Sequence, residues 1–213
     1  VRPSNFGFNA ETAVSNAFQN EINESQESIK QKVWEEFDAF AAKLRSHGVH
    51  VTVFDDTISP VKPDAIFPNN WVSLHRDGTV ILYPMCAPNR RYERRKDIID
   101  SLKTNFKISQ IIDLSKYEAE NRFLEGTGSI VFDHVNRLAY ACLSPRTDKD
   151  ILAEVCEILN YKAVPFHSHD PAGKEIYHTN VMMCIAEKFA VICMDSISDQ
   201  QEREFVSDSL TKT

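Results

Sequence analysis

The sequence predicts an α/β protein built from a repeated unit of two strands, a helix and a further strand. Two short apolar runs, a turn and a polar helical pattern recur three times along the 213 residues. The composition, 42% hydrophobic and 26% charged, is that of a folded globular chain. Repeats of this kind bury their strand edges by closing on themselves, so a propeller of small αβ units is expected.

The first clear repeat begins with strands at 71–74 and 79–85, joined by a turn at 76–78. β-Branched and aromatic residues dominate both runs, and Gly78 supplies the turn. A helix is expected from about 91 to 103, followed by a short apolar strand at 108–114. The unit therefore reads ββαβ.

The second repeat has the same order. Strands are expected at 129–132 and 138–143 around a turn at 134–136. A helix at 148–159, with Thr147 as its N-cap, leads into a strand at 162–166.

The third repeat stops after its helix. Strands at 179–185 and 189–194 flank a turn at 187–188, and a helix follows at 199–210. No closing strand is present before Thr213.

The N-terminal part predicts a partial copy of the same unit. A long helix at 25–46 is closed by Gly48 and leads into a strand at 49–54. We expect residues 1–213 to form one incomplete domain.

Charge and composition exclude several classes of function. The net charge is −7 and the pI about 5.5, which disfavours a nucleic-acid partner. The basic cluster at 89–96 is either a solvated helix start or an anion site. The longest uncharged apolar runs, such as 189–194, are far shorter than the roughly 20 residues that span a bilayer, so no membrane partner is expected. Residues 1–5 lack the pattern of a signal peptide, which predicts a cytoplasmic protein.

The five cysteines show no C-x-x-C pair, so a disulfide scaffold and a cysteine zinc site are not expected. Cys142, Cys184 and Cys193 lie inside apolar runs, where cysteine acts as a small core residue. The polar segment 167–170 contains two histidines and an aspartate but reads as a surface loop rather than a metal site.

Polar clusters recur at the equivalent point of the three repeats, just before the first strand. They cover residues 66–71, 123–129 and 177–180. A single cluster of this kind is usually a turn or a structural hydrogen bond. Their recurrence indicates a shared site, because a propeller would gather them around its centre.

These clusters resemble the ordered motifs of the arginine deiminase and amidinotransferase superfamily, the penteins, over nearly the whole chain. The chain is most similar to the arginine-deiminase-related branch that includes citrulline hydrolases. The matching motifs are Phe67-Pro-Asn-Asn70, Ala87-Pro-Asn-Arg-Arg-Tyr-Glu93, Leu124-Glu-Gly-Thr-Gly128, Leu143-Ser-Pro-Arg-Thr147 and His178-Thr-Asn180.

The resemblance implies a propeller of five αβ repeats, of which about three and a half to four are present here. It also implies a catalytic cysteine, histidine and carboxylate, with no metal or organic cofactor. By motif, His178 would be the general acid and base, and Glu125 would orient and stabilise its imidazole. Arg146, with Arg90 or Arg91, would hold the α-carboxylate of an amino-acid substrate.

Two departures from the deiminase motifs bear on the substrate. Asn70 and Asn180 stand where deiminases acting on a guanidinium group carry aspartate. A buried guanidinium needs carboxylate partners, whereas a neutral ureido group needs amides that donate and accept hydrogen bonds. The resemblance therefore favours citrulline over arginine.

A third departure concerns the nucleophile. In the superfamily it follows a glycine-rich turn in the last repeat, and none of the five cysteines here matches that position. We expect a C-terminally truncated chain that is itself inactive and that self-associates through exposed strand edges. A homodimer is a further implication of the resemblance.

The function expected from the sequence is hydrolysis of the ureido C–N bond of citrulline to ornithine, ammonia and CO2, with a small amino acid as the partner. Two alternatives stay open: a deiminase or amidinotransferase acting on arginine or methylarginine, and a non-catalytic pentein binding protein.

Overall fold

The computed structural model describes residues 1–16, 19 and 24–211, and the chain divides into two compact units. The first comprises Val1–Pro68 and Ala87–Ile108, and the second comprises Asn69–Cys86 and Ser109–Thr213. The prediction of one domain over residues 1–213 stays a prediction. No helix in the described ranges is long and apolar enough to cross a membrane.

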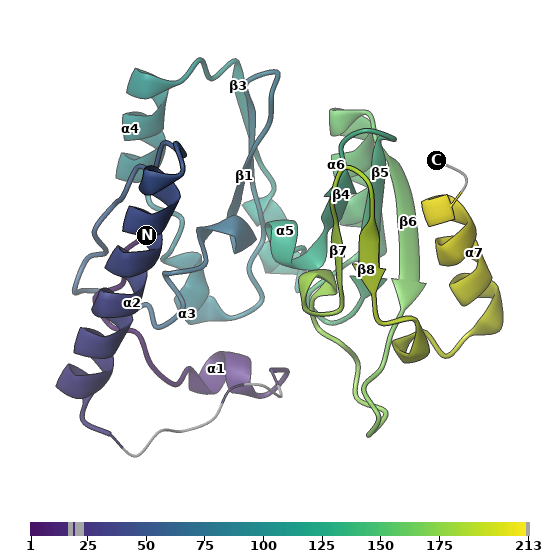
Figure 1. Ribbon diagram of the computed structural model, residues 1–213, viewed down its shortest axis with the longest axis horizontal. Helices are drawn as coiled ribbons and strands as arrows, with labels where there is room; N and C mark the ends of the chain where they lie inside the picture. Colours follow the sequence, from purple (N-terminus) through teal and green to yellow (C-terminus); the bar gives the residue numbers. More distant parts are fainter. Residues whose placement is uncertain (17–18, 20–23, 212–213) are drawn as a thin grey trace. The chain divides into compact units, whose positions relative to one another are not determined.

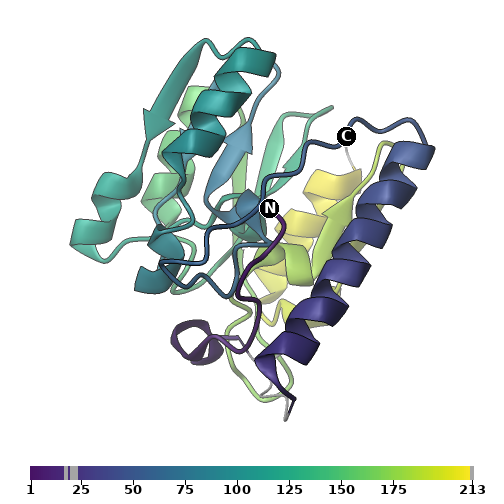
Figure 2. The same cartoon turned by 90° about the vertical axis from the view of Figure 1, so that its left-hand side faces the viewer.

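The first unit carries four helices in the ranges described. They are α1 (Ala10–Ala13), α2 (Gln26–Ser46), α3 (Pro88–Arg91) and α4 (Lys96–Asn105). The long helix α2, seen along its length in Figure 2, starts at its N-cap Ser25 and ends beside Gly48, whose φ is +80°. Both ends are where the sequence predicts them. The N-terminal segment lies along this helix, with the Arg2 guanidinium 4.1 Å from the Trp34 ring centre.

Two predictions for this unit are wrong. Residues 49–54 form no strand, because the only pairing described there is a bridge between Arg2 and Asp55 and a strand needs a continuous partner. The start predicted for the next helix, at about residue 91, is also wrong: α4 begins at Lys96, and the separate short helix α3 ends at Arg91.

The second unit contains three small sheets in its described part, drawn in Figure 1. In the first, β1 (Val72–Leu74) and β2 (Thr79–Leu82) form a hairpin and β3 (Gln110–Asp113) runs parallel to β2. The second sheet repeats this with β4 (Val131–Asp133), β5 (Leu138–Leu143) and β6 (Lys162–His167). The third is the hairpin β7 (Met183–Ile185) and β8 (Ala190–Ile192). The predicted strand order is confirmed, while closure into a propeller stays a prediction.

Short helices and turns link these sheets. They are α5 (Gly126–Ser129), α6 (Lys149–Leu159), α7 (Gln200–Thr211) and the 3-10 turns η1 (Pro68–Asn70), η2 (Ser115–Glu120), η3 (Thr179–Val181) and η4 (Met194–Ser196). Two strands start later than predicted, because Ser129 ends α5 and residues 179–181 form η3. The N-cap of α6 is Asp148 rather than Thr147: one oxygen of Asp148 accepts from the backbone N–H groups of Asp150 and Ile151. The side chain of Thr147 is buried instead.

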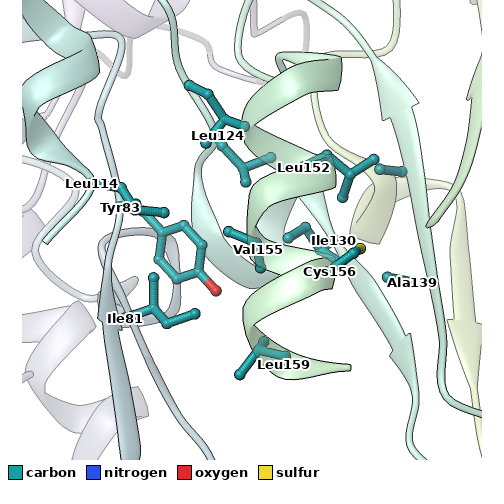
Figure 3. Packing of buried hydrophobic residues seen from close by; sticks show 12 residues of the cluster. Ile81, Tyr83, Leu114, Leu124, Ile130, Ala139, Leu152, Val155, Cys156 and Leu159 are labelled. Carbon is teal, nitrogen blue, oxygen red and sulfur yellow. The ribbon is translucent and has the colours of Figure 1, made fainter. Parts of the chain in front are cut away.

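Strand β5 is apolar throughout because both faces of its sheet are covered. Ala139 and Ala141 belong to the cluster that contains the apolar face of α6. Tyr140 and Cys142 belong to a second cluster, which includes Val206 of α7. Figure 3 shows the first cluster, in which Tyr83, directly after β2, points toward α6 and Ala139 lies on the other side of that helix.

The prediction of three core cysteines is confirmed for Cys142 and wrong for the other two. Cys142 is buried, whereas Cys184 and Cys193 are exposed. In the hairpin β7–β8 alternate residues face opposite sides, so Met183 is buried while Cys184 points away from the core.

Candidate active site

Three of the predicted motifs meet within the second unit. Asn70 ends the turn that precedes β1, Glu125 stands at the start of α5 before β4, and His178 immediately precedes η3 before β7. All three side chains are buried. The strand starts of successive repeats therefore supply one cluster.

Glu125 and His178 form the centre of this cluster. The His178 Nε2 atom lies 2.8 Å from Glu125 Oε2. His178 is 4% exposed and Glu125 is 0% exposed. A carboxylate at this distance fixes the imidazole orientation and stabilises a positive charge on it. The pair can thus hold a histidine that takes up and releases a proton.

Contacts to the charged form of Glu125 compensate for its burial. Its Oε1 atom accepts from the backbone N–H of Cys86 at 3.0 Å. The guanidinium of Arg146 lies 3.5 Å from Oε2 and is stacked on the ring of Tyr177 at 4.7 Å. Arg146 is therefore part of the cluster and is itself buried, while its contact with a substrate carboxylate stays a prediction.

Two glycines allow the motifs to approach one another. Gly126 has φ +45°, and a Cβ there would lie 2.2 Å from the backbone oxygen of Asn69. A Cβ at Gly128 would lie 2.7 Å from Asn70 Oδ1 and 2.8 Å from the imidazole of His178. The amide of Asn70 and the ring of His178 therefore both face Gly128, and no larger residue fits between them.

The structure adds residues that the sequence interpretation missed. Ser129 Oγ accepts from the backbone N–H of Glu125 at 3.0 Å and donates to the carbonyl of Arg146 at 2.9 Å. Thr179 Oγ1 donates to the carbonyl of Ser129 at 2.6 Å. Ser129 lies in the same motif as Glu125, and Thr179 lies in the same motif as His178. A hydroxyl residue beside a candidate catalytic residue is the sequence feature that could have identified them.

Asn180 is placed differently from Asn70. Asn180 lies in η3 with an exposed side chain, and within the described ranges its side chain makes no hydrogen bond. Asn70 is buried, and its Oδ1 accepts from the side chain of Asn69 at 3.0 Å. Of the two asparagines, only Asn70 faces Gly128 together with the ring of His178. A substrate contact by Asn180 stays a prediction.

Arg90 and Arg91 lie in α3, in the first unit. The guanidinium of Arg90 is buried and binds both carboxylate oxygens of Glu93, at 2.8 and 2.9 Å. The interpretation of the basic cluster as a solvated helix start is thus wrong at Arg90. A role for either arginine in binding the substrate carboxylate stays a prediction.

The two buried cysteines are poor nucleophiles. Burial raises the pKa of the Cys142 thiol, and it raises the pKa of Cys156 to about 11. A thiol with a raised pKa is protonated near neutral pH and reacts slowly. Neither is therefore suited to attack a substrate carbon.

Within the described ranges no group of three or more histidine, cysteine or acidic residues is placed to hold a metal ion. The prediction of a surface loop at 167–170 is only partly right, because His167 ends β6 and Ser168 is buried. The exposed ring of His167 pairs with Glu202, Nδ1 to Oε1, at 2.8 Å.

A family model and several solved structures match the chain. A family model described as N,N dimethylarginine dimethylhydrolase, eukaryotic, matches residues 2–213. No curated protein sequence matches the chain.

Solved structures share the fold at low identity. The N-terminal domain of ArgZ, an arginine dihydrolase from cyanobacteria, in a mutant form bound to substrate, matches with a TM-score of 0.72 and 16% identity, over 98% of this chain and 70% of that one. AgrE in complex with ornithine and NAD+ matches with a TM-score of 0.75 and 16% identity, over 98% and 28%. A variant of dimethylarginine dimethylaminohydrolase, as an adduct with S-methyl-L-thiocitrulline, matches with a TM-score of 0.50 and 20% identity, over 64% and 50%. The chain thus spans about a quarter of AgrE.

Proposed function

Because the chain belongs to the N,N-dimethylarginine dimethylhydrolase family, within the pentein superfamily, we propose that it carries the acid and base machinery of a hydrolase that cleaves a C–N bond at the ureido carbon of citrulline. The products would be ornithine, ammonia and CO2. One observation carries the choice of substrate: the neutral amide of Asn70 faces Gly128 together with the imidazole of His178.

An amide suits a ureido group because it offers both a donor and an acceptor. A guanidinium at the same point would meet the neutral amide of Asn70, and its positive charge would gain no carboxylate partner from that residue. Glu125 is not proposed to bind a substrate guanidinium, since its two oxygens already contact Cys86, His178 and Arg146.

The proposed reaction proceeds in two steps. A cysteine thiolate attacks the ureido carbon, a C–S bond forms, and the bond to the ornithine nitrogen breaks as His178 protonates that nitrogen. His178 then removes a proton from water; the water oxygen bonds to the carbamoyl carbon, and the C–S bond breaks to release the cysteine thiolate. The carbamic acid released decomposes to ammonia and CO2. Glu125 stabilises the imidazolium in the states where His178 carries the extra proton.

The thiolate is not assigned to Cys142 or Cys156, whose pKa values are raised by burial. Following the resemblance to penteins, we propose that the thiolate comes from the last repeat of the pentein fold. Arg146 is the proposed partner of the substrate α-carboxylate, because its planar guanidinium is already fixed between Glu125 and the ring of Tyr177.

A second candidate is hydrolysis of arginine or a methylated arginine. The family description names dimethylarginine, and ArgZ is described as an arginine dihydrolase. Such an enzyme would release a different set of products from the same site.

A product panel distinguishes the two candidates. The enzyme as its source produces it is incubated with citrulline, arginine or N,N-dimethylarginine, and amino-acid products are quantified by mass spectrometry. Ornithine from citrulline, with slower turnover of the other two substrates, is expected. Faster turnover of arginine or dimethylarginine would overturn the citrulline proposal.

The variant Asn70→Asp tests the observation itself. A carboxylate at this buried position should lower kcat/KM for citrulline by about tenfold to a hundredfold, because it loses the donor to the ureido oxygen and adds a buried charge. Asn105→Asp, at the exposed end of α4, makes the same chemical change and should leave kcat/KM unaltered. Equal kinetics for both variants would remove Asn70 from the proposed mechanism.

A further inference from the structure

A cleft lies in the same unit as the candidate active site, at the other end of strand β1. It is a cleft of about 520 Å³, formed by the turns after β1 and β4 and by the end of α6. Asn70 precedes β1, whereas His75 follows it, so the active site and the cleft lie at opposite ends of this strand. The volume is in the range of small-ligand pockets.

The cleft is rich in hydrogen-bond donors, although the chain as a whole is acidic. Arg76 is exposed, and within the described residues its guanidinium has no hydrogen bond or ion pair. Arg137 donates from Nε to the carbonyl of Asn160 at 3.1 Å and from Nη2 to the carbonyl of Leu159 at 2.5 Å, which fixes its guanidinium against the C-terminus of α6 and leaves Nη1 without a partner within the described residues. Arg76 thus offers the forked donors that bind phosphate oxygens, and Arg137 adds the donors of its Nη1.

Two histidines line the cleft with one ring nitrogen each held in place. His75 Nε2 lies 2.7 Å from Ser73 Oγ, and His134 Nδ1 lies 2.7 Å from the hydroxyl of Tyr161. No other ring-nitrogen contact is found within the described ranges, so Nδ1 of His75 and Nε2 of His134 remain available to a ligand.

The walls provide a planar and apolar surface. The guanidinium of Arg137 lies 4.1 Å from the centre of the Tyr161 ring, and Leu74 lines the same cleft with its side chain exposed. Asp77 is the one carboxylate in the described lining, and its Oδ1 accepts from the backbone N–H of Thr79 at 2.9 Å. With two arginines against one aspartate, the lining is net positive.

We infer that this cleft binds a small phosphate ester, whose phosphate oxygens are held by Arg76, Arg137 and the histidine N–H groups and whose organic part lies against Leu74 and Tyr161. A phosphate is favoured over a carboxylate because the donors outnumber the acceptors of a single carboxylate group. The cleft contributes no residue to the proposed reaction.

The inference is tested with phenyl phosphate as the probe. Its binding to the 213-residue chain is measured by calorimetry, and the ring resonances of His75, His134 and Tyr161 are followed by NMR. Saturable binding with shifts at these rings is expected. Arg76→Gln should weaken binding by about tenfold. Lys149→Gln removes an exposed positive charge at the opposite end of α6 from the lining residue Leu159 and should leave the affinity within about twofold.

The inference would be overturned by the absence of saturable binding, by equal affinities for the two variants, or by shifts confined to His178. The affinities of two further probes separate the contributions of the anion and the ring: benzoate has the ring without a phosphate, and inorganic phosphate has the anion without a ring. Benzoate binding as tightly as phenyl phosphate would also contradict the assignment to a phosphate. Because Arg76 is exposed and has no partner within the described residues, its substitution should not unfold the chain.

Discussion

Glu125 contacts three other residues of the candidate active site. Its two oxygens engage the backbone of Cys86, the imidazole of His178 and the guanidinium of Arg146. A carboxylate buried to this degree is retained only with such partners. Its negative charge, rather than its shape alone, is what the proposed mechanism requires.

The variant Glu125→Gln therefore separates charge from shape. The amide can still accept from the Cys86 N–H, but it cannot stabilise an imidazolium, so kcat should fall by about a hundredfold or more. Steady-state kinetics on the active enzyme measure this.

The matched control is Glu118→Gln. Glu118 Oε1 accepts from the backbone N–H of Met85 at 2.8 Å, which is the same type of contact one residue earlier in the chain. This variant should retain kcat. Similar losses in both variants would show that only a structural hydrogen bond matters.

Gly128 tests the close approach of the motifs. In Gly128→Ala the added methyl would meet the amide of Asn70 and the ring of His178, both closer than van der Waals contact. Activity should be lost and the free energy of unfolding reduced by about 1–3 kcal/mol. Urea denaturation and kinetics measure the two effects.

Gly7→Ala is the control, since a Cβ there would have its nearest neighbours at 3.6 Å. It should change neither activity nor stability by a measurable amount. Full activity of Gly128→Ala would contradict the described arrangement of Asn70 and His178.

At the scale of elements, α6 is central because it contributes five buried residues between two sheets of the second unit. Its N-terminus is held by Asp148, which caps the first turn and forms two hydrogen bonds with Arg122, at 2.9 and 3.0 Å. Partial burial acts to raise the pKa of Asp148, but the contacts with Arg122 and the backbone N–H groups outweigh it, and the pKa is lowered.

Removal of this cap should destabilise the protein in a pH-dependent way. Asp148→Ala is expected to lower the free energy of unfolding by about 0.5–2 kcal/mol at neutral pH. Because the pKa in the folded state lies below the unfolded value of about 3.9, this contribution is present above that pH and is lost as the pH falls through the folded pKa. Denaturation at about pH 7 and about pH 3, on either side of that unfolded value, measures the difference.

Asp150→Ala is the control for Asp148→Ala. Asp150 also pairs with Arg122, at 2.9 Å, but its carboxylate is exposed. Its loss should cost less than about 0.5 kcal/mol at either pH. A gap between wild type and Asp148→Ala that stays constant down to about pH 3 would contradict the role assigned to the ionised cap.

At the scale of the whole molecule, two properties have opposite effects on self-association: an exposed strand edge and a net charge of −7. Strand β8 pairs only with β7 in the described part of the chain, and its residue Val191 is 59% exposed. Exposed apolar edges pair with further copies, while net charge opposes association.

We therefore predict that the 213-residue chain self-associates through β8. Val191→Lys should shift sedimentation-velocity profiles toward the monomer, because a charged edge resists strand pairing. Val135→Lys places the same charge at a 72% exposed position in the turn after β4 and should leave association unchanged. A wild-type chain that stays monomeric at all concentrations would contradict this prediction.

The sequence alone determined the order of strands and helices in the three repeats, because the periodicity and turn signals of each element are local. The recurring motifs also singled out the segments that hold Asn70, Glu125 and His178, and the resemblance to the penteins added Arg146. The roles of these residues stay predictions. The second unit bears out that order.

Only the tertiary structure decided which of these side chains meet. Glu125 and His178 are 53 residues apart, and their contact depends on how separate sheets pack and on the space left at Gly128. The same packing leaves Asn180 and Cys184 exposed, although their local sequence is like that of buried neighbours. Local pattern specifies an element, whereas contacts between elements depend on packing distances that no single segment encodes.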